Sequence, residues 1–238
     1  MQTPGRLAGY QLGYYTLQGA ASAVPPLCLE VAPGHRVADL CSAPGSKTGQ
    51  LVLLMEDRGL VLANELKGDR IRALSANLER LGATIVAIRR GNGESVPVAE
   101  PGFDRVLADV PCSGEGTVRA PLPDRDEWIP PRERLRLHRR QLALLQRAVK
   151  LTRPGGLIVY STCTYHPLEN EAVIAAALAA GWPLALEPIE LPGLPADPGV
   201  ERFEEITVPA AVAERCLRLY PHRLDSWGFF VARLRRLD

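Results

Sequence analysis

The chain has 238 residues, of which 46% are hydrophobic and 23% are charged, and this globular composition argues against extensive disorder. Its 28 basic and 27 acidic residues leave a net charge of +1, so overall charge cannot drive non-specific wrapping of nucleic acid. A nearly neutral total still allows a local basic patch that binds nucleic acid. No run approaches the roughly 20 apolar residues that cross a bilayer.

The cysteines occur singly along the chain. Positions 28, 41, 112, 163 and 216 contain no CxxC pair, so the spacing of a structural zinc site is absent. An odd number of cysteines, after an N-terminus without a charged and then apolar leader, fits a reducing compartment better than a disulfide framework. We therefore expect a cytoplasmic protein that binds no membrane and no metal.

Short β-type runs alternate with longer helical patterns. Strands are predicted, in chain order, at residues 36–40, 60–65, 84–88, 105–108, 157–160 and 227–234. Helices are predicted at residues 47–55, 69–81, 134–151 and 169–180. The strands are apolar on both faces, which indicates an α/β fold with a mostly parallel sheet between two layers of helices.

One catalytic domain accounts for most of the length. Residues 1–30 are interpreted as an N-terminal lead-in packed on a domain of residues 31–238. The proline-rich segments 119–131 and 190–200 are too short to separate further domains. We expect the protein to be a monomer.

The first predicted strand runs into a turn of small residues, Cys-Ser-Ala-Pro-Gly-Ser-Lys at 41–47, and the second strand ends at Glu65, 20 residues after Gly45. In doubly wound sheets, ligands bind beyond the carboxyl ends of the strands, and an acidic residue at this offset grips ribose hydroxyls. The pairing predicts a nucleoside site, while a plain strand–helix turn with a solvated Glu65 explains the same residues equally well. A phosphate loop is excluded, because Cys41 and Ser46 stand where its glycines belong.

Two thiols follow neighbouring strands. Cys112 comes three residues after Asp109 at the end of the fourth strand, and Cys163 follows the fifth, so both are expected at the edge that carries the turn of residues 41–47. Two thiols at adjacent strand ends, with an aspartate close by, indicate a catalytic role and not mere packing. The other cysteines are interpreted as inert packing: Cys28, Cys41 and Cys216.

Motifs in the same order resemble those of the RNA cytosine-5 methyltransferases of the Nop2/NSUN/Rsm family. They are D-L-C-S-A-P-G-S-K-T at 39–48, A-N-E at 63–65, D-V-P-C-S-G-E-G at 109–116 and Y-S-T-C-T-Y-H-P-L-E-N-E at 160–171. With a similar lead-in and closing strand, the resemblance covers residues 9–234. It implies a Rossmann-like methyltransferase fold, with a mostly parallel seven-stranded sheet and helices on both faces, and S-adenosylmethionine as the cofactor.

The resemblance also implies the roles of individual residues. Cys163 is the nucleophile, Cys112 assists release of the methylated product, and Asp109 holds the cytosine edge and lies near the cofactor. Glu65 binds the cofactor, and Asn92 stands where most members place an aspartate that reads the adenine. The remaining cofactor residues are Cys41, Ser42, Ala43, Pro44, Gly45, Ser46 and Lys47.

The chemistry explains why such an enzyme needs a thiol. Carbon 5 of cytosine is a weak nucleophile, and a thiolate that adds to carbon 6 raises the electron density on carbon 5. An aspartate near ring nitrogen 3 stabilises the charge that develops on the base. The thiolate requires a lowered pKa, for which the sulfonium charge of the cofactor is one source.

RNA is the expected partner, with the target base out of any stacked helix. The N-E-L and P-C-S-G-E-G motifs, Trp128 and the Tyr-Pro-His-Arg run at 220–223 most resemble bacterial small-subunit rRNA enzymes, and tRNA enzymes of minimal size are the alternative. An idle RNA-binding module would not need both thiols, and a DNA cytosine-5 enzyme would use Cys112 as its nucleophile. Candidate phosphate contacts, in a pattern more typical of a solvated face, are Arg132, Arg134, Arg136, Arg139, Arg140, Arg147, Lys150, Arg233, Arg235 and Arg236.

Overall fold

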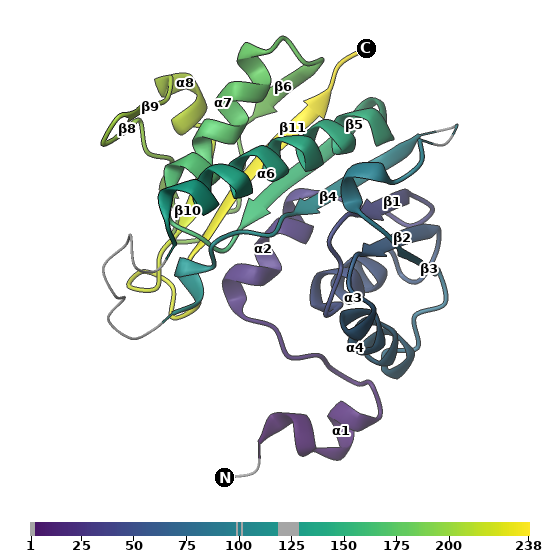
Figure 1. Cartoon of the computed structure of the whole chain (residues 1–238). Helices are drawn as coiled ribbons and strands as arrows, with labels where there is room; N and C mark the ends of the chain where they lie inside the picture. The colour runs from purple at the N-terminus through teal and green to yellow at the C-terminus, as the bar shows by residue number, and fades with distance from the viewer. Residues whose placement is uncertain (1–2, 99, 101, 119–128) are drawn as a thin grey trace.

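A twisted central sheet runs through the computed structural model, which describes residues 3–98, 100, 102–118 and 129–238 (Figure 1). Trp128 and most of the proline-rich segment 119–131 lie outside the described residues. The strands hydrogen-bond in the order β3-β2-β1-β4-β5-β11-β10-β7, and β6 also pairs with β11. Their bounds are β1 Arg36–Asp39, β2 Leu60–Glu65, β3 Val86–Arg90, β4 Phe103–Asp109, β5 Thr152–Thr162, β6 Leu184–Glu187, β7 Asp197–Pro198, β10 Leu217–Leu219 and β11 Phe229–Arg236.

The first five strands of this order are parallel, and β11 is antiparallel to β5. The six strands predicted from the sequence correspond to β3, β2, β1, β4, β5 and β11, whereas β6, β7 and β10 were not predicted and bring the sheet to nine strands, two more than the resemblance implies. The short β10 pairs with the beginning of β11 and β6 with its end, and β7 lies outside β10. A separate hairpin is formed by β8 Arg202–Phe203 and β9 Ile206–Thr207. The α/β fold is therefore confirmed.

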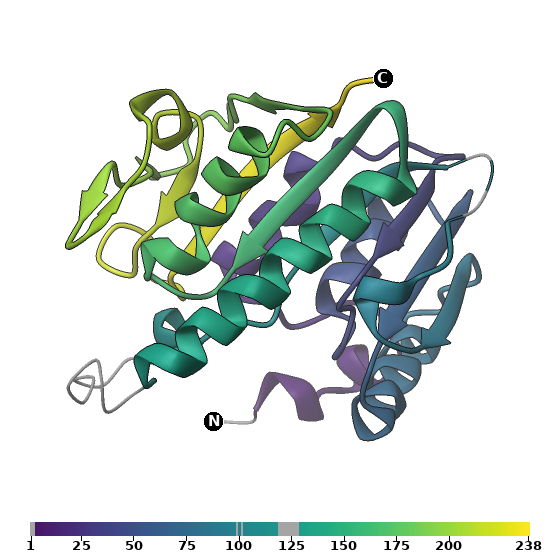
Figure 2. The same ribbon diagram turned by 45° about the horizontal axis from the view of Figure 1, so that its top comes forward.

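Helices cover both faces of the sheet (Figures 1 and 2). One face carries α2, α3 and α4, and the other carries α6 and α7, which contact each other along the sheet. The helix bounds are α1 Ala8–Gln11, α2 Ala20–Cys28, α3 Ser46–Leu54, α4 Gly68–Arg80, α6 Pro131–Leu151, α7 Glu171–Ala179 and α8 Ala210–Ala213. Short 3-10 turns are η1 Pro4–Arg6, η2 Gly93–Ser95, η3 Glu115–Thr117 and η4 Pro167–Glu169.

Side chains of consecutive residues in the central strands pack into two separate hydrophobic cores, one on each face of the sheet. Along β4, Val106 and Ala108 pack into the core under α6 and α7, whereas Leu107 packs into the core under α2 and α3. All three side chains are fully buried. Burial on both faces explains why the strands are continuously apolar in sequence.

The helix α2 was not predicted, because Pro25 and Pro26 lie inside it. Pro26 has no N–H to offer the carbonyl oxygen of Ser22, four residues earlier. The side chain of Gln18 takes over this role, since its Nε2 donates to the Ser22 carbonyl oxygen at 2.9 Å. The polar backbone group that the proline leaves unpaired is thereby satisfied.

The lead-in also contacts the domain before α2 begins. The Arg80 guanidinium at the end of α4 lies 3.8 Å from the centre of the Tyr10 ring and donates to the carbonyl oxygens of Tyr10 and Tyr15. The expected boundary after residue 30 stays a prediction. Within the described part of the chain, no helix is long and apolar enough to cross a bilayer.

The topology sets up one functional edge. Sheet order reverses between β1 and β4, whose following helices lie on opposite faces, so their carboxyl ends diverge around a crevice. Asp39 ends β1, and Asp109 ends β4 opposite Ser161 of β5. Side chains that follow these strands therefore meet at one place.

Candidate active site

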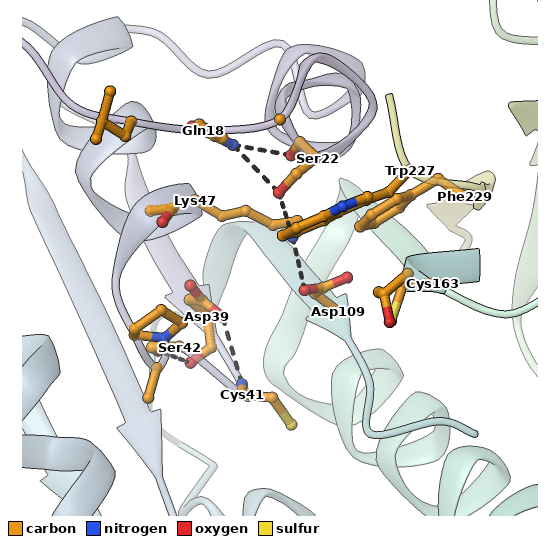
Figure 3. A pocket seen from close by; sticks show the side chains of 16 residues that line it. Gln18, Ser22, Asp39, Cys41, Ser42, Lys47, Asp109, Cys163, Trp227 and Phe229 are labelled. Carbon is orange, nitrogen blue, oxygen red and sulfur yellow. Dashed lines mark hydrogen bonds and ion pairs between the residues drawn. The ribbon is translucent and has the colours of Figure 1, made fainter. Parts of the chain in front are cut away.

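A pocket opens at this crevice, between the strand ends and the segment that leads into α2 (Figure 3). Several residues assigned from the sequence line it: Cys41, Ser42, Ala43, Pro44, Ser46, Lys47, Asp109 and Cys163. Further lining residues were not assigned: Gln18, Ser22, Asp39, Thr117, Trp227 and Phe229. The fold thus brings the turn after β1, the aspartate after β4 and one of the two expected thiols to the same cavity.

The turn after β1 is held tightly against β2. The Ser42 N–H donates to the Asn64 carbonyl oxygen at 2.9 Å, and the Ser42 hydroxyl donates to the Asp39 carbonyl oxygen at 2.9 Å. Gly45 then adopts a φ of +104°, in the region that favours glycine, and α3 begins at the next residue. A Cβ at Gly45 would lie 3.0 Å from Leu74, so this position needs glycine for two reasons.

Asp39 is a buried carboxylate at the base of the pocket. It accepts from the Thr48 hydroxyl at 2.8 Å and from the Cys41 N–H at 3.3 Å. Burial nevertheless raises the pKa of Asp39 to about 6. Asp39 is not among the residues assigned from the sequence, although its place as the last residue of the first strand, directly before the turn of small residues, was a usable signal.

Asp109 is held by two neighbours. Lys47 Nζ lies 2.8 Å from Asp109 Oδ2, and the Ser161 hydroxyl donates to Asp109 Oδ1 at 2.6 Å. The same Lys47 Nζ donates to the Ser22 hydroxyl at 2.9 Å and lies 4.8 Å from the centre of the Phe229 ring. Lys47 therefore links the turn after β1, α2 and Asp109.

The two thiols that the sequence predicts to be neighbours touch. The sulfur atoms of Cys112 and Cys163 are 3.3 Å apart, and the Cys163 N–H points to the Cys112 sulfur at 3.4 Å. The hydrogen bond from the Cys112 thiol lowers the pKa of Cys163, and the same bond together with burial raises the pKa of Cys112. The directions of the two shifts favour Cys163 over Cys112 as the thiol that gives up its proton more readily.

A buried ion cluster fixes the loops that carry these thiols. Arg134 of α6 lies 2.9 Å from Glu115 and 3.1 Å from Glu169, and all three side chains are buried. Glu169 accepts the N–H of Ser113, next to Cys112, at 2.9 Å. Glu115 accepts from the hydroxyl of Thr164, next to Cys163, at 3.1 Å. Each cysteine is thus one residue away from a side-chain bond into the cluster.

A second pocket adjoins the first, and Cys41 lines both. Glu65 lines it, accepts the Lys67 N–H at 2.8 Å and lies 3.3 Å from Arg70. Gly93 contributes to this wall. The neighbouring Asn92 uses its side-chain oxygen to accept the N–H of Glu94, so its contact with a cofactor stays a prediction.

Two of the remaining cysteines behave as packing residues. Cys28 and Cys216 belong to the cores on opposite faces of the sheet. Burial raises the pKa of Cys28 to about 12 and raises the pKa of Cys216 as well. Burial also raises the pKa of Cys41, which indicates a neutral thiol at the wall between the two pockets.

Several of the candidate arginines are engaged within the chain. Besides the buried Arg134, Arg140 lies 3.5 Å from Glu94, and Arg147 donates to the Glu94 carbonyl oxygen at 2.6 Å. In the C-terminal strand, Arg235 pairs with Glu187 at 2.5 Å. These arginines form ion pairs and hydrogen bonds within the chain that the sequence pattern does not reveal. Among the described residues, no cluster of three or more His, Cys, Asp or Glu side chains could hold a metal ion.

Comparison with known proteins identifies the family. Residues 26–235 match the family described as 16S rRNA methyltransferase RsmB/F. The chain is 36% identical to the tRNA (cytosine(49)-C(5))-methyltransferase of Pyrococcus abyssi, covering 98% of the chain and 73% of that protein. It is 38% identical to the ribosomal RNA small subunit methyltransferase F of Citrobacter koseri, covering 98% of the chain and 47% of that protein.

A solved structure described as NSun6 from Pyrococcus horikoshii with SFG superposes with a TM-score of 0.81 at 27% identity, covering all of this chain and 57% of that one. The chain thus spans about half the length of two of these three relatives. The fold, the order of the strand-end motifs and the matched range agree with one another. The chain belongs to the RsmB/F family of methyltransferases.

Proposed function

We propose that the chain transfers a methyl group from S-adenosylmethionine to carbon 5 of a cytosine in RNA, through a covalent bond between the base and Cys163. The observation that carries this proposal is the pair of sulfurs 3.3 Å apart, at a pocket lined by Asp109 and the turn after β1. Relatives named for cytosine-C(5) methylation support the same reaction. An idle RNA-binding module would have no use for a thiol with a lowered pKa.

The residues of both pockets suit the proposed cofactor. S-adenosylmethionine supplies a methyl group on a positively charged sulfur, together with an amino acid portion and a ribose. Carboxylates stand along the path between the pockets, with Asp39 and Asp109 in the first and Glu65 in the second. Negative groups of this kind fit a cationic ligand and ribose hydroxyls. The relative solved with SFG, an analogue of S-adenosylmethionine, supports this assignment.

Cys163 performs the first step of the proposed reaction. Its thiolate forms a bond to carbon 6, and the electron pair of the carbon 5–carbon 6 double bond moves into the ring, so that carbon 5 becomes nucleophilic. Carbon 5 then bonds to the methyl carbon while the bond from that carbon to the positively charged sulfur breaks, and the electron pair of the broken bond stays on sulfur, which becomes neutral. Asp109, fixed by Lys47 and Ser161, holds the edge of the base, and the Lys47 ammonium beside it offsets the negative charge that moves into the ring.

Cys112 acts in the last step. Loss of the carbon 5 proton restores the double bond and breaks the bond between carbon 6 and Cys163. The Cys112 thiol can pass its proton to the departing sulfur across 3.3 Å, and the Cys112 thiolate that remains takes up the proton that leaves carbon 5, so that the thiol is restored. The two roles differ because Cys163 is the one of these two thiols that lines the pocket with Asp109, and the directions of the pKa shifts, lowered for Cys163 and raised for Cys112, agree with this. A DNA-type arrangement, with Cys112 as the nucleophile, would need a lowered pKa at Cys112 and not at Cys163.

Ribosomal RNA is the substrate that we propose, with tRNA as the second candidate. The matched family is described by 16S rRNA, whereas a relative of comparable identity is named for tRNA. A cytoplasmic location is part of the proposal, because free thiols persist in a reducing compartment. Transfer of a radiolabelled methyl group to purified small-subunit rRNA, tRNA and duplex DNA decides the substrate. Stronger labelling of DNA than of either RNA would overturn the proposal.

The mechanism is tested by trapping the covalent RNA adduct. Cys112→Ala should attack and methylate but release slowly, so that a shifted protein–RNA band survives denaturing electrophoresis. Cys163→Ala should show no methyl transfer and no band, and the double variant should resemble it. A band that persists in Cys163→Ala and disappears in Cys112→Ala would show that Cys112, and not Cys163, is the nucleophile.

Cys216→Ala is the matched control. This thiol is buried in the core under α6 and α7, away from both pockets. Its removal should lower the melting temperature without producing an adduct band. Loss of methyl transfer in this variant, with the protein still folded, would show that thiol removal in itself disturbs the site.

A further inference from the structure

Trp227 stands out at the pocket because it is large, aromatic and exposed. Its side chain lines the pocket with 43% of its surface open to solvent, whereas Ser226 before it and Gly228 after it are buried. Figure 3 shows the indole pointing into the pocket from the same side as Phe229, which is 4% exposed. Leaving an indole open to water forgoes the stabilisation that burial of so large an apolar surface gives.

The backbone on both sides of Trp227 is pinned. The Ser226 hydroxyl accepts the N–H of Ala21 in α2 at 3.0 Å. The Gly228 N–H donates to the Gly116 carbonyl oxygen at 2.8 Å, and the Gly116 N–H donates to the Cys163 carbonyl oxygen at 2.9 Å. The indole is therefore presented from a rigid frame that also carries the Cys163 backbone.

The surroundings of the indole select the kind of ligand that it meets. Among the described lining residues the cationic side chain is Lys47, and it is already 2.8 Å from Asp109. A Cβ added at Gly19 would lie 3.8 Å from the Trp227 ring, and the uncharged lining residues of the pocket include Leu17, Thr117 and Phe229. A phosphate would find few free charges here, whereas the flat face of a nucleobase could stack on the indole.

We propose that Trp227 is a stacking surface for an RNA base at the mouth of the pocket. The inference rests on the proposed function, since it adds a binding residue to the same site. A cytosine that leaves its helix loses the stacking of its neighbours, and contact with an indole compensates for part of that loss. The stacked base is either the target cytosine or the nucleotide beside it, and both offer the same π-face.

Fluorescence of Trp227 tests the inference directly. The chain has three tryptophans, so the replacements Trp128→Phe and Trp182→Phe leave Trp227 as the one reporter. A five-nucleotide RNA with a central cytidine should quench its emission. Stacking on an aromatic residue contributes roughly 1–3 kcal/mol per base, so Trp227→Ala should bind this RNA about 10-fold or more weakly, as measured by calorimetry on the otherwise unaltered chain.

Two further replacements separate stacking from general apolar contact. Trp227→Phe keeps an aromatic ring and should stay within about threefold of the original affinity, whereas Trp227→Leu should resemble Trp227→Ala. A five-nucleotide RNA without a base at the central position shows whether the stacked base is the target cytosine or the nucleotide beside it. If its binding no longer depends on Trp227, the target cytosine is the stacked base, and if the dependence persists, the neighbour is.

Equal RNA affinity in Trp227→Ala and the unaltered chain would overturn the inference. So would a loss of affinity for S-adenosylmethionine with RNA binding unchanged, because the indole would then cover the cofactor. The measurement depends on RNA binding alone and does not require methyl transfer. Base-dependent quenching without any methylation would therefore contradict the proposed function while leaving the stacking role intact.

Discussion

Replacing Arg134 with methionine should destabilise the protein strongly. The guanidinium lies 2.9 Å from Glu115 and 3.1 Å from Glu169, whose side chains are 8% and 0% exposed. Removing one partner of a buried ion pair leaves uncompensated charge, which typically costs about 3–5 kcal/mol. In this case two carboxylates lose the same cation, although Gln141 and the Ser113 N–H still donate to Glu169. For a chain of this size the loss corresponds to a melting temperature lower by roughly 6–20 °C.

Urea unfolding followed by circular dichroism measures the loss, and the same helix offers a control. Arg136→Met removes an exposed arginine whose partner is Glu133, and it should leave the free energy of unfolding unchanged. Adding Glu115→Gln and Glu169→Gln to Arg134→Met should recover part of the lost stability, because the stranded charges disappear. If Arg134→Met unfolds at the same urea concentration as Arg136→Met, buried charge is not what holds these loops.

Three further outcomes follow from the site. Glu65→Ala should lower the affinity for S-adenosylmethionine by about tenfold or more, since hydrogen bonds to a charged group contribute about 1.5–3 kcal/mol; unchanged affinity by calorimetry would refute the assignment. Iodoacetamide should alkylate Cys163 at lower pH than an ordinary thiol, and Cys112→Ala should move the pH profile upward, because the bond that lowers the pKa is lost. An unmoved profile would mean that another group lowers it. Asp39, with its pKa raised to about 6, binds a proton more tightly in the folded state, so its contribution to stability is full below about pH 4 and is lost as pH rises through about 6. The free energy of unfolding of the unaltered chain minus that of Asp39→Asn should therefore fall between about pH 4 and 7, and a rise would contradict the burial argument.

The adjacency of β4 and β5 could be anticipated from the sequence, because each of these strands ends in a turn that carries a thiol. It puts Cys112 and Cys163 at neighbouring strand ends, and the pairing of the two strands and the contact of the two sulfurs confirm it. The boundaries were less certain. Residues 153–156 read as a turn, Arg-Pro-Gly-Gly, yet β5 already begins at Thr152, and β3 and β11 each lie about two residues later than expected.

Other features depend on distant parts of the chain and leave no local pattern. Arg134 belongs to a row of arginines on one helix, and only the approach of Glu115 and Glu169 distinguishes it as the buried one. The helix α2 contains two consecutive prolines, and its formation requires a glutamine outside it to bond a carbonyl oxygen. Trp227 could be read as a core residue of a closing strand until its exposure at the pocket is known.

The glycines at 116 and 228 limit how this site can change during divergence. A side chain at Gly116 would lie 2.6 Å from the Gly228 carbonyl oxygen and 2.8 Å from that of Cys163, and one at Gly228 would enter the ring of Tyr165. A larger residue at Gly116 would displace the backbone of Cys163 or Gly228, and one at Gly228 would push aside the ring of Tyr165. The residues next to them, Thr117 and Trp227, reach the pocket wall and carry no such restriction. A lineage could therefore alter which RNA surface fits the mouth of the pocket, one substitution at a time, while the chemistry beneath it stays fixed.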